Sequence, residues 1–121
     1  MDIQQCAVAC ALTVATGMAQ AQEPDQAFLT TVMQHYECNE MARLAILSPD
    51  DSTRCAANFL RVKLHFIPEI DQQAYARLPP SERTRINRHA YAAFAEWQAT
   101  HTRTVRRLRE MAGLFACPRM C

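Results

Sequence analysis

Residues 80–115 read PSERTRINRHAYAAFAEWQATHTRTVRRLREMAGLF. Mostly apolar or small side chains recur along this stretch at steps of three and four residues, which is the spacing of one face of an α-helix. The members of this row are Ile86, Ala90, Ala93, Trp97, His101, Thr104, Leu108, Met111 and Phe115. A single helix over this span would be about 50 Å long. The rest of the chain must therefore supply a surface that covers the row.

The composition of the whole chain is typical of a small helical protein. It has 121 residues, of which 50% are apolar and only 2 are glycine. Few glycines and no evenly spaced turn clusters argue against a β-sandwich or a barrel. We expect an all-α fold, a small three- to four-helix bundle stapled by disulfides, with one long C-terminal helix.

Prolines mark the expected helix starts, because a helix leaves its first N–H groups without partners. Pro24 opens the first helix, with Asp25 in its first turn. The apolar face of this helix drifts after Cys38, so either two of its faces are buried or it bends near Asn39. Pro49 opens the second helix. Its predicted core face contains Cys55, Phe59, Val62 and Phe66.

A topology follows from the expected helix lengths. The first two helices run in opposite directions, and a short third helix over residues 68–78 crosses the bottom of the bundle. The long helix then runs parallel to the first helix, with its apolar row packed against the second. Its C-terminal tail arrives at the end of the bundle that holds Cys38 and Cys55.

The first residues predict export from the cytoplasm. Residues 6–18 are apolar and uncharged, and Ala19-Gln20-Ala21 fits a small-x-small cleavage site. The run is too short to span a bilayer stably. We expect a signal peptide at residues 1–21, cleavage near Ala21, and a single helical domain at residues 22–121 that is periplasmic or secreted. The alternatives are a start further upstream and a buried N-terminal helix of a cytosolic protein, since residues 1–5 contain an acid and no Lys or Arg.

Four cysteines follow the predicted cleavage site, and an even number in a small exported chain indicates two disulfides. They are Cys38, Cys55, Cys117 and Cys121. Cys38 could pair with Cys55, which leaves the two tail cysteines to each other. Alternatively, both tail cysteines reach Cys38 and Cys55. The expected topology favours this second arrangement, which also closes longer loops.

The same cysteines allow a different chemistry. Thiolates, an imidazole and nearby methionines are suitable ligands for copper, and closely spaced cysteines can cycle as a redox pair. The alternative function is therefore a copper-type metal-binding protein or a thiol redox protein that uses the four cysteines. The metal ligands would be His35, Cys38, Cys117 and Cys121.

Charge is distributed unevenly along the chain. Residues 22–78 hold eight acidic and five basic side chains, whereas residues 79–121 hold three acidic and eight basic ones. Arg103, Arg106, Arg107 and Arg109 form a dense basic patch within the long helix. Such a patch favours an acidic protein partner in the cell envelope or an anionic surface. Nucleic acid is not expected, because the chain is predicted to be exported and no aromatic residues are interleaved with these arginines.

No motif identifies a reaction. The histidines lack the HExxH spacing of zinc enzymes, no Gly-rich phosphate loop is present, and no serine has a nucleophile-elbow context. An enzyme is therefore not favoured, and no cofactor is expected. The predicted function is non-enzymatic protein binding by a small exported helical protein, such as an inhibitor, an immunity protein or an envelope adaptor. The partner and the oligomeric state stay open.

Overall fold

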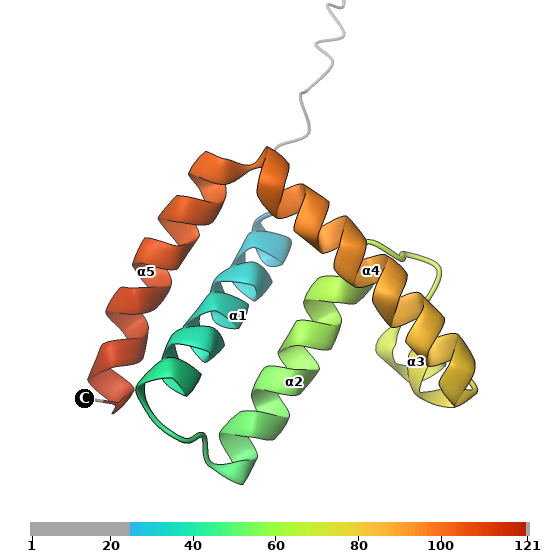
Figure 1. Cartoon of the computed structure of the whole chain (residues 1–121), viewed down its shortest axis with the longest axis horizontal. Helices are drawn as coiled ribbons and strands as arrows, with labels where there is room; N and C mark the ends of the chain where they lie inside the picture. The colour runs from blue at the N-terminus through green and yellow to red at the C-terminus, as the bar shows by residue number, and fades with distance from the viewer. Residues whose placement is uncertain (1–24, 121) are drawn as a thin grey trace, which may run out of the picture.

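The computed structural model describes the backbone of residues 25–120 and the side chains of residues 25–118. All regular structure in this part of the chain is helical, which confirms the predicted all-α class. The helices are α1 (Gln26–Leu44), α2 (Pro49–Leu64), α3 (Gln72–Arg77), α4 (Pro80–Thr100) and α5 (Thr102–Met120) (Figure 1). None of these helices has both the length and the apolar character needed to cross a membrane. The predicted signal peptide and Cys121 lie outside the described residues.

The helix starts follow the local chemistry of prolines and short polar side chains. Side-chain oxygens of Asp25, Ser48 and Asp71 each accept a hydrogen bond from a backbone N–H two or three residues later, at 3.0, 3.1 and 2.7 Å. These caps satisfy N–H groups that the first helical turn leaves without partners. Pro49 and Pro80 occupy the first positions of α2 and α4. In α1 the cap is Asp25, so the helix begins one residue after it.

Helix α1 lies between α2 and α5, and both neighbours pack along it (Figure 1). It is unbroken past Asn39, so the first of the two predicted alternatives, burial on two faces, is correct. A helix with neighbours on two sides cannot confine its buried residues to one stripe. Its buried residues are Phe28, Val32, Tyr36, Glu37 and Met41.

The predicted single helix over residues 80–115 is wrong, because the chain bends at His101. This residue has φ −122° and ψ 46°, and Figure 1 shows a sharp angle between α4 and α5. Side chains close the last turn of α4: Thr100 Oγ1 donates to the carbonyl of Glu96 at 3.0 Å, and His101 Nδ1 lies 2.8 Å from the carbonyl oxygen of Trp97. In a continuing helix, backbone N–H groups of the next turn would donate to the last carbonyl groups of α4. The side chains of Thr100 and His101 take their place.

The bend changes which residues of the predicted row are buried. In α4, Ile86 and Ala90 are buried as expected, and Trp97 is half-buried. In α5, Leu108 is the one large residue of the row that is buried, whereas Met111 and Phe115 are exposed. The buried residues of α5 are Val105, Leu108, Ala112 and Ala116. His101 is exposed at the bend, so its predicted place on a buried stripe is also wrong.

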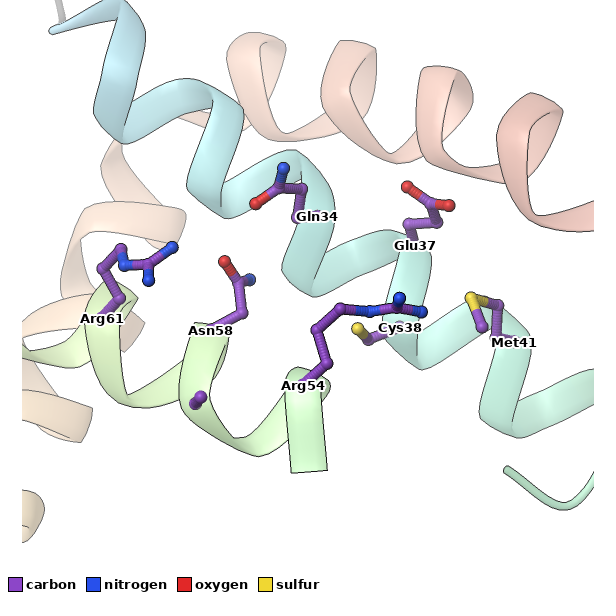
Figure 2. A pocket seen from close by; sticks show the side chains of 8 residues that line it. Gln34, Glu37, Cys38, Met41, Arg54, Asn58 and Arg61 are labelled. Atoms are coloured by element: carbon purple, nitrogen blue, oxygen red, sulfur yellow. The ribbon is translucent and has the colours of Figure 1, made fainter. Parts of the chain in front are cut away.

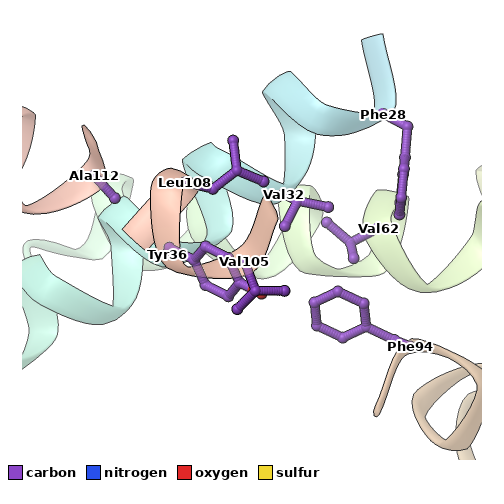
Figure 3. Packing of buried hydrophobic residues seen from close by; sticks show 8 residues of the cluster. All are labelled: Phe28, Val32, Tyr36, Val62, Phe94, Val105, Leu108 and Ala112. Atoms are coloured by element: carbon purple, nitrogen blue, oxygen red, sulfur yellow. The ribbon is translucent and has the colours of Figure 1, made fainter. Parts of the chain in front are cut away.

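The main core joins α1, α2, α4 and α5 (Figure 3). Its buried members are Phe28, Val32, Tyr36, Val62, Phe94, Val105, Leu108 and Ala112. Phe94, which is not in the predicted row, is only 2% exposed and reaches from α4 toward Val62 and Val105. From the predicted core face of α2, Val62 is fully buried, while Phe59 and Phe66 pack against the cluster from its edge. The expected contact between the C-terminal stretch and α2 is therefore confirmed, with Phe94 at its centre.

A second, smaller core lies where α2, α3 and α4 meet. Leu64, Ile67, Ile86 and Ala90 are buried there. The predicted short helix over residues 68–78 is shorter than expected, since regular helix is limited to Gln72–Arg77. As predicted, α1 and α2 run in opposite directions, and α5 runs parallel to α1 and ends near the α1–α2 loop (Figure 1).

A disulfide joins α1 to α2 through Cys38 and Cys55, whose Cα atoms are 5.8 Å apart. The favoured arrangement, in which the tail cysteines reach these two residues, is therefore wrong. The two cysteines lie on facing turns near the α1–α2 loop, within ordinary disulfide reach. At the end of α5, Ala116 is buried and Cys117 is exposed. Cys117 is itself disulfide-bonded.

Candidate functional site

The basic patch predicted from sequence lies in the first half of α5. Arg103, Arg106, Arg107 and Arg109 are all exposed. Ion pairs among the described residues are instead found within α1, α2 and α4, and they join Arg43 to Glu40, Arg54 to Asp51 and Arg85 to Glu82. The arginines of α5 therefore present positive charge that the described part of the chain does not neutralise by direct pairing.

Arg109 differs from the other three arginines because it also contacts α1 and α4. Its guanidinium carbon lies 4.9 Å from the centroid of the Tyr36 ring, and its Nη2 donates to Gln98 Oε1 at 3.5 Å. The Tyr36 hydroxyl donates to the same oxygen at 2.8 Å. Burial raises the pKa of Tyr36, so its hydroxyl keeps its proton at neutral pH. Arg109 is therefore held in place by α1 and α4, whereas Arg103, Arg106 and Arg107 are exposed.

Large apolar side chains are exposed on the second half of α5. Met111, Leu114 and Phe115 are 40%, 74% and 52% exposed. The α1–α2 loop, which lies near the end of α5, adds Ile46, which is 99% exposed (Figure 1). The apolar spacing predicted Met111 and Phe115 as core residues, because a core row and a surface row have the same period. We call Arg103, Arg106, Arg107, Met111, Leu114 and Phe115 the outward face of α5.

The predicted metal ligands are not brought together in the described part of the chain. Cys38 is bonded to Cys55, so its sulfur is not a thiolate. The His35 ring stacks on Phe59 with centroids 4.2 Å apart. Cys121 lies outside the described residues, and no group of three His, Cys, Asp or Glu side chains converges within them. The oxidised state of Cys38 removes the sulfur ligand that a copper site next to His35 would need.

His35 has an apolar environment on the inner side of α1. Its ring lies between Phe59 and Phe94, whose centroid is 5.7 Å away. Burial, together with the positive charges of Lys63 and Arg109, lowers the pKa of His35 to about 4. Burial also lowers the pKa of His65, which stacks on Phe28 with centroids 3.7 Å apart. Both rings therefore act as uncharged packing groups at neutral pH.

Acid should weaken the fold through His35. The unfolded chain takes up this proton near pH 6.5, whereas the folded protein does so near pH 4. The contribution to stability is therefore complete above pH 6.5 and is lost as the pH falls toward 4. Because the ring is partly exposed, we expect a loss of about 1–2 kcal/mol between pH 7 and pH 4.5. Urea unfolding at both pH values measures this loss.

The matched variants for this measurement are His35→Phe and His89→Gln. The first keeps an aromatic ring against Phe59 and removes the titrating group, so the share of the pH dependence that comes from His35 should disappear, while the share from His65 stays. The second removes an exposed histidine from α4 and should behave like the unchanged protein. Equal pH dependence in all three proteins would contradict the assignment to His35.

The hollows on the described surface include three that differ in their lining residues. The α1–α2 hollow has a volume of about 410 Å³ and is shown in Figure 2. In it Asn58, which is 6% exposed, points from α2 toward Gln34 and donates through Nδ2 to the carbonyl of Thr31 at 3.0 Å. Its Oδ1 has no hydrogen-bond partner in the described part of the chain. The residues lining this hollow are Gln34, Glu37, Cys38, Met41, Arg54, Ala57, Asn58 and Arg61.

The other two hollows are more open. One, of about 700 Å³, lies against α3 and includes Asp25, His65 and Gln72. The other, of about 660 Å³, lies at the corner between α4 and α5, and we call it the α4–α5 hollow. Its lining consists of Gln98, Ala99, Thr102, Val105, Arg106, Arg109 and Glu110. Two residues of the predicted basic patch thus share a concave site, which their sequence spacing alone did not indicate.

Comparisons of this chain with protein-family models, with curated proteins and with solved structures found no match. The functional interpretation therefore depends on the chemistry of this chain's own surface.

Proposed function

We propose that this protein binds another protein without catalysing a reaction on it, and that the outward face of α5 is the contact surface. One observation carries the proposal: arginines without ion-pair partners in the described chain lie beside large exposed apolar side chains on one helix. Arginine and aromatic side chains are enriched among the residues that dominate binding energy at protein interfaces. Contiguous exposed apolar side chains are also a common feature of interaction sites.

The arrangement on α5 favours a partner of a particular chemistry. Arg103, Arg107 and Leu114 are spaced i, i+4 and i+11, so they share one line of the helix, opposite the buried residues. The line is basic in its first half and apolar in its second. A partner that offers acidic side chains next to an apolar contact would match both halves. Complementary charge would also speed the encounter of the two proteins at low salt.

A protein surface suits this helix better than a lipid surface. A helix that lies in a membrane interface buries a wide apolar face in the lipid. In α5 the continuous apolar face is already packed in the core through Val105, Leu108 and Ala112. The exposed residues Met111, Leu114 and Phe115 are too few to replace it.

The proposed place of action is the cell envelope or the exterior. The predicted signal peptide at residues 1–21 supports this placement. The Cys38–Cys55 disulfide also supports it, because disulfides persist in oxidising compartments. An inhibitor, an immunity protein and an envelope adaptor are all consistent with a small helical protein that presents one recognition surface.

The experiment is affinity capture from envelope extract, followed by purification of the captured protein and measurement of its affinity. The triple variant Arg103→Glu/Arg106→Glu/Arg107→Glu should weaken binding by more than about 100-fold, because several central contacts become repulsive. The matched control, Arg61→Glu/Arg77→Glu/Arg88→Glu, reverses three exposed arginines on other helices and should change affinity by less than about fivefold. Equal effects of the two triple variants would assign binding to net charge and would contradict a specific α5 surface.

A further inference from the structure

The α4–α5 hollow is rich in hydrogen-bond donors. Arg106 and Arg109 lie one turn apart on α5, and Thr102 and Gln98 complete the polar lining. Arginine can only donate hydrogen bonds, so the Gln98 atom that Arg109 contacts must be the amide oxygen. That oxygen also accepts from Tyr36, which leaves the Gln98 Nε2 group as a further donor. The one carboxylate in the lining belongs to Glu110.

The donors are partly held in position before any ligand binds. Arg109 lies over the Tyr36 ring at 4.9 Å and is joined to Gln98, which is in turn bonded to the Tyr36 hydroxyl. Tyr36 is buried in the main core, so this network is attached to closely packed side chains. Neither arginine has an ion-pair partner within the described residues. A guanidinium that is already oriented loses less conformational freedom when it binds a ligand.

We propose that the α4–α5 hollow receives a carboxylate of the protein partner, which the guanidinium groups of Arg106 and Arg109 bind through its two oxygens. This inference rests on the proposed function, and it names the chemistry that the partner must present. The planar fork of a guanidinium matches a carboxylate in geometry and in charge. A volume of about 660 Å³ accommodates an acidic side chain together with part of its backbone.

Glu110 provides a test in which the expected change in affinity is opposite to that of the arginine variants. It lies in the lining of the hollow, and its negative charge would repel an incoming carboxylate. Removing that charge should therefore strengthen binding, whereas loss of either arginine fork should weaken it. A general electrostatic attraction to the basic helix would not separate Arg106 from its neighbours on the same helix.

The test uses the full chain and an acetylated hexaglutamate peptide at fixed ionic strength, with hexaglutamine as the uncharged control. Arg106→Lys and Arg109→Lys keep the charge but remove the fork, and each should weaken binding about tenfold. The matched variants Arg103→Lys and Arg107→Lys alter arginines outside the hollow and should change affinity by less than twofold. Glu110→Gln should tighten binding several-fold. Titration of the arginine Nε–Hε NMR signals should show the largest shifts at Arg106 and Arg109.

The inference is overturned if the four lysine variants bind hexaglutamate equally well, or if Glu110→Gln has no effect. If hexaglutamate then still binds the triple Glu variant more weakly than the unchanged protein, the basic surface of α5 stays supported. Only the proposed carboxylate site in the hollow is rejected. If the captured partner is insensitive to the triple Glu variant, the proposed function fails instead. The two failures are therefore distinguishable.

Discussion

Replacing Phe94 with Ala should destabilise the protein by about 3–5 kcal/mol, the usual range for a large aromatic side chain removed from a core. The Phe94 side chain is 2% exposed, and its ring lies near the rings of His35 in α1, Phe59 in α2 and Trp97 in α4 itself. Ring centroids of Phe59, Phe66 and Trp97 lie 6.3, 6.3 and 6.2 Å from it. Truncation would leave a cavity between α4 and the α1–α2 pair, which those rigid rings could not readily fill. Urea unfolding followed by far-UV circular dichroism measures the change.

Two controls lie on the same helix. Tyr91 is 57% exposed and lies one turn earlier, so Tyr91→Ala should cost less than about 1 kcal/mol. Trp97 is half-buried, with its ring 5.1 Å from Phe28, so Trp97→Ala should have an intermediate effect. A larger loss for Trp97→Ala than for Phe94→Ala would mean that the predicted row, and not Phe94, carries the contact between α4 and the core.

The second large effect is expected from loss of the Cys38–Cys55 disulfide. The two cysteines are 17 residues apart. In the chain-entropy account, closing a loop of that length stabilises a fold by about 3 kcal/mol, because the unfolded chain loses freedom. The double variant Cys38→Ala/Cys55→Ala should therefore unfold roughly 10–20 °C below the unchanged protein. Thermal unfolding under non-reducing conditions measures this shift.

The pairing itself is open to direct mapping. Trypsin separates these cysteines at Arg43 and Arg54, so the fragment that ends at Arg43 should be joined to the fragment of residues 55–61. Reduction should release both fragments. A fragment that joins Cys38 to Cys117 would contradict the fold, as would a double variant that unfolds at the original temperature.

The bend at His101 determines what α5 can do on its surface. A straight continuation of α4 would have turned Met111 and Phe115 toward the core. Because α5 begins anew at Thr102, it packs through Val105 and Ala112 instead and presents its apolar side chains and arginines outward. The same corner forms the α4–α5 hollow. The proposed interaction surface and the proposed carboxylate site therefore depend on one local break in a helix.

Local chemistry made much of the helical framework predictable. The start of α2 is predictable because Ser48 and Pro49 act within their own turn. The basic patch was also identifiable, because four arginines within seven residues share a short segment of any helix. The sequence did not show that Arg109 is anchored while the other three arginines are not. Arg109 is held by Tyr36 and Gln98, which are distant in sequence from each other and meet only in the fold.

The sequence by itself determined the helical class, the start of α2, and the concentration of positive charge near the C-terminus, because these depend on residue type and on neighbours within a few positions. Tertiary structure decided which face of α5 is buried, which cysteine Cys38 bonds, and where Arg109 is held. Each of these depends on which surfaces meet after the helices pack. The row of residues 86–115 has one period throughout, but the bend at His101 gives its two halves different neighbours. Periodicity determines which residues share a face, whereas packing determines whether that face is core or surface.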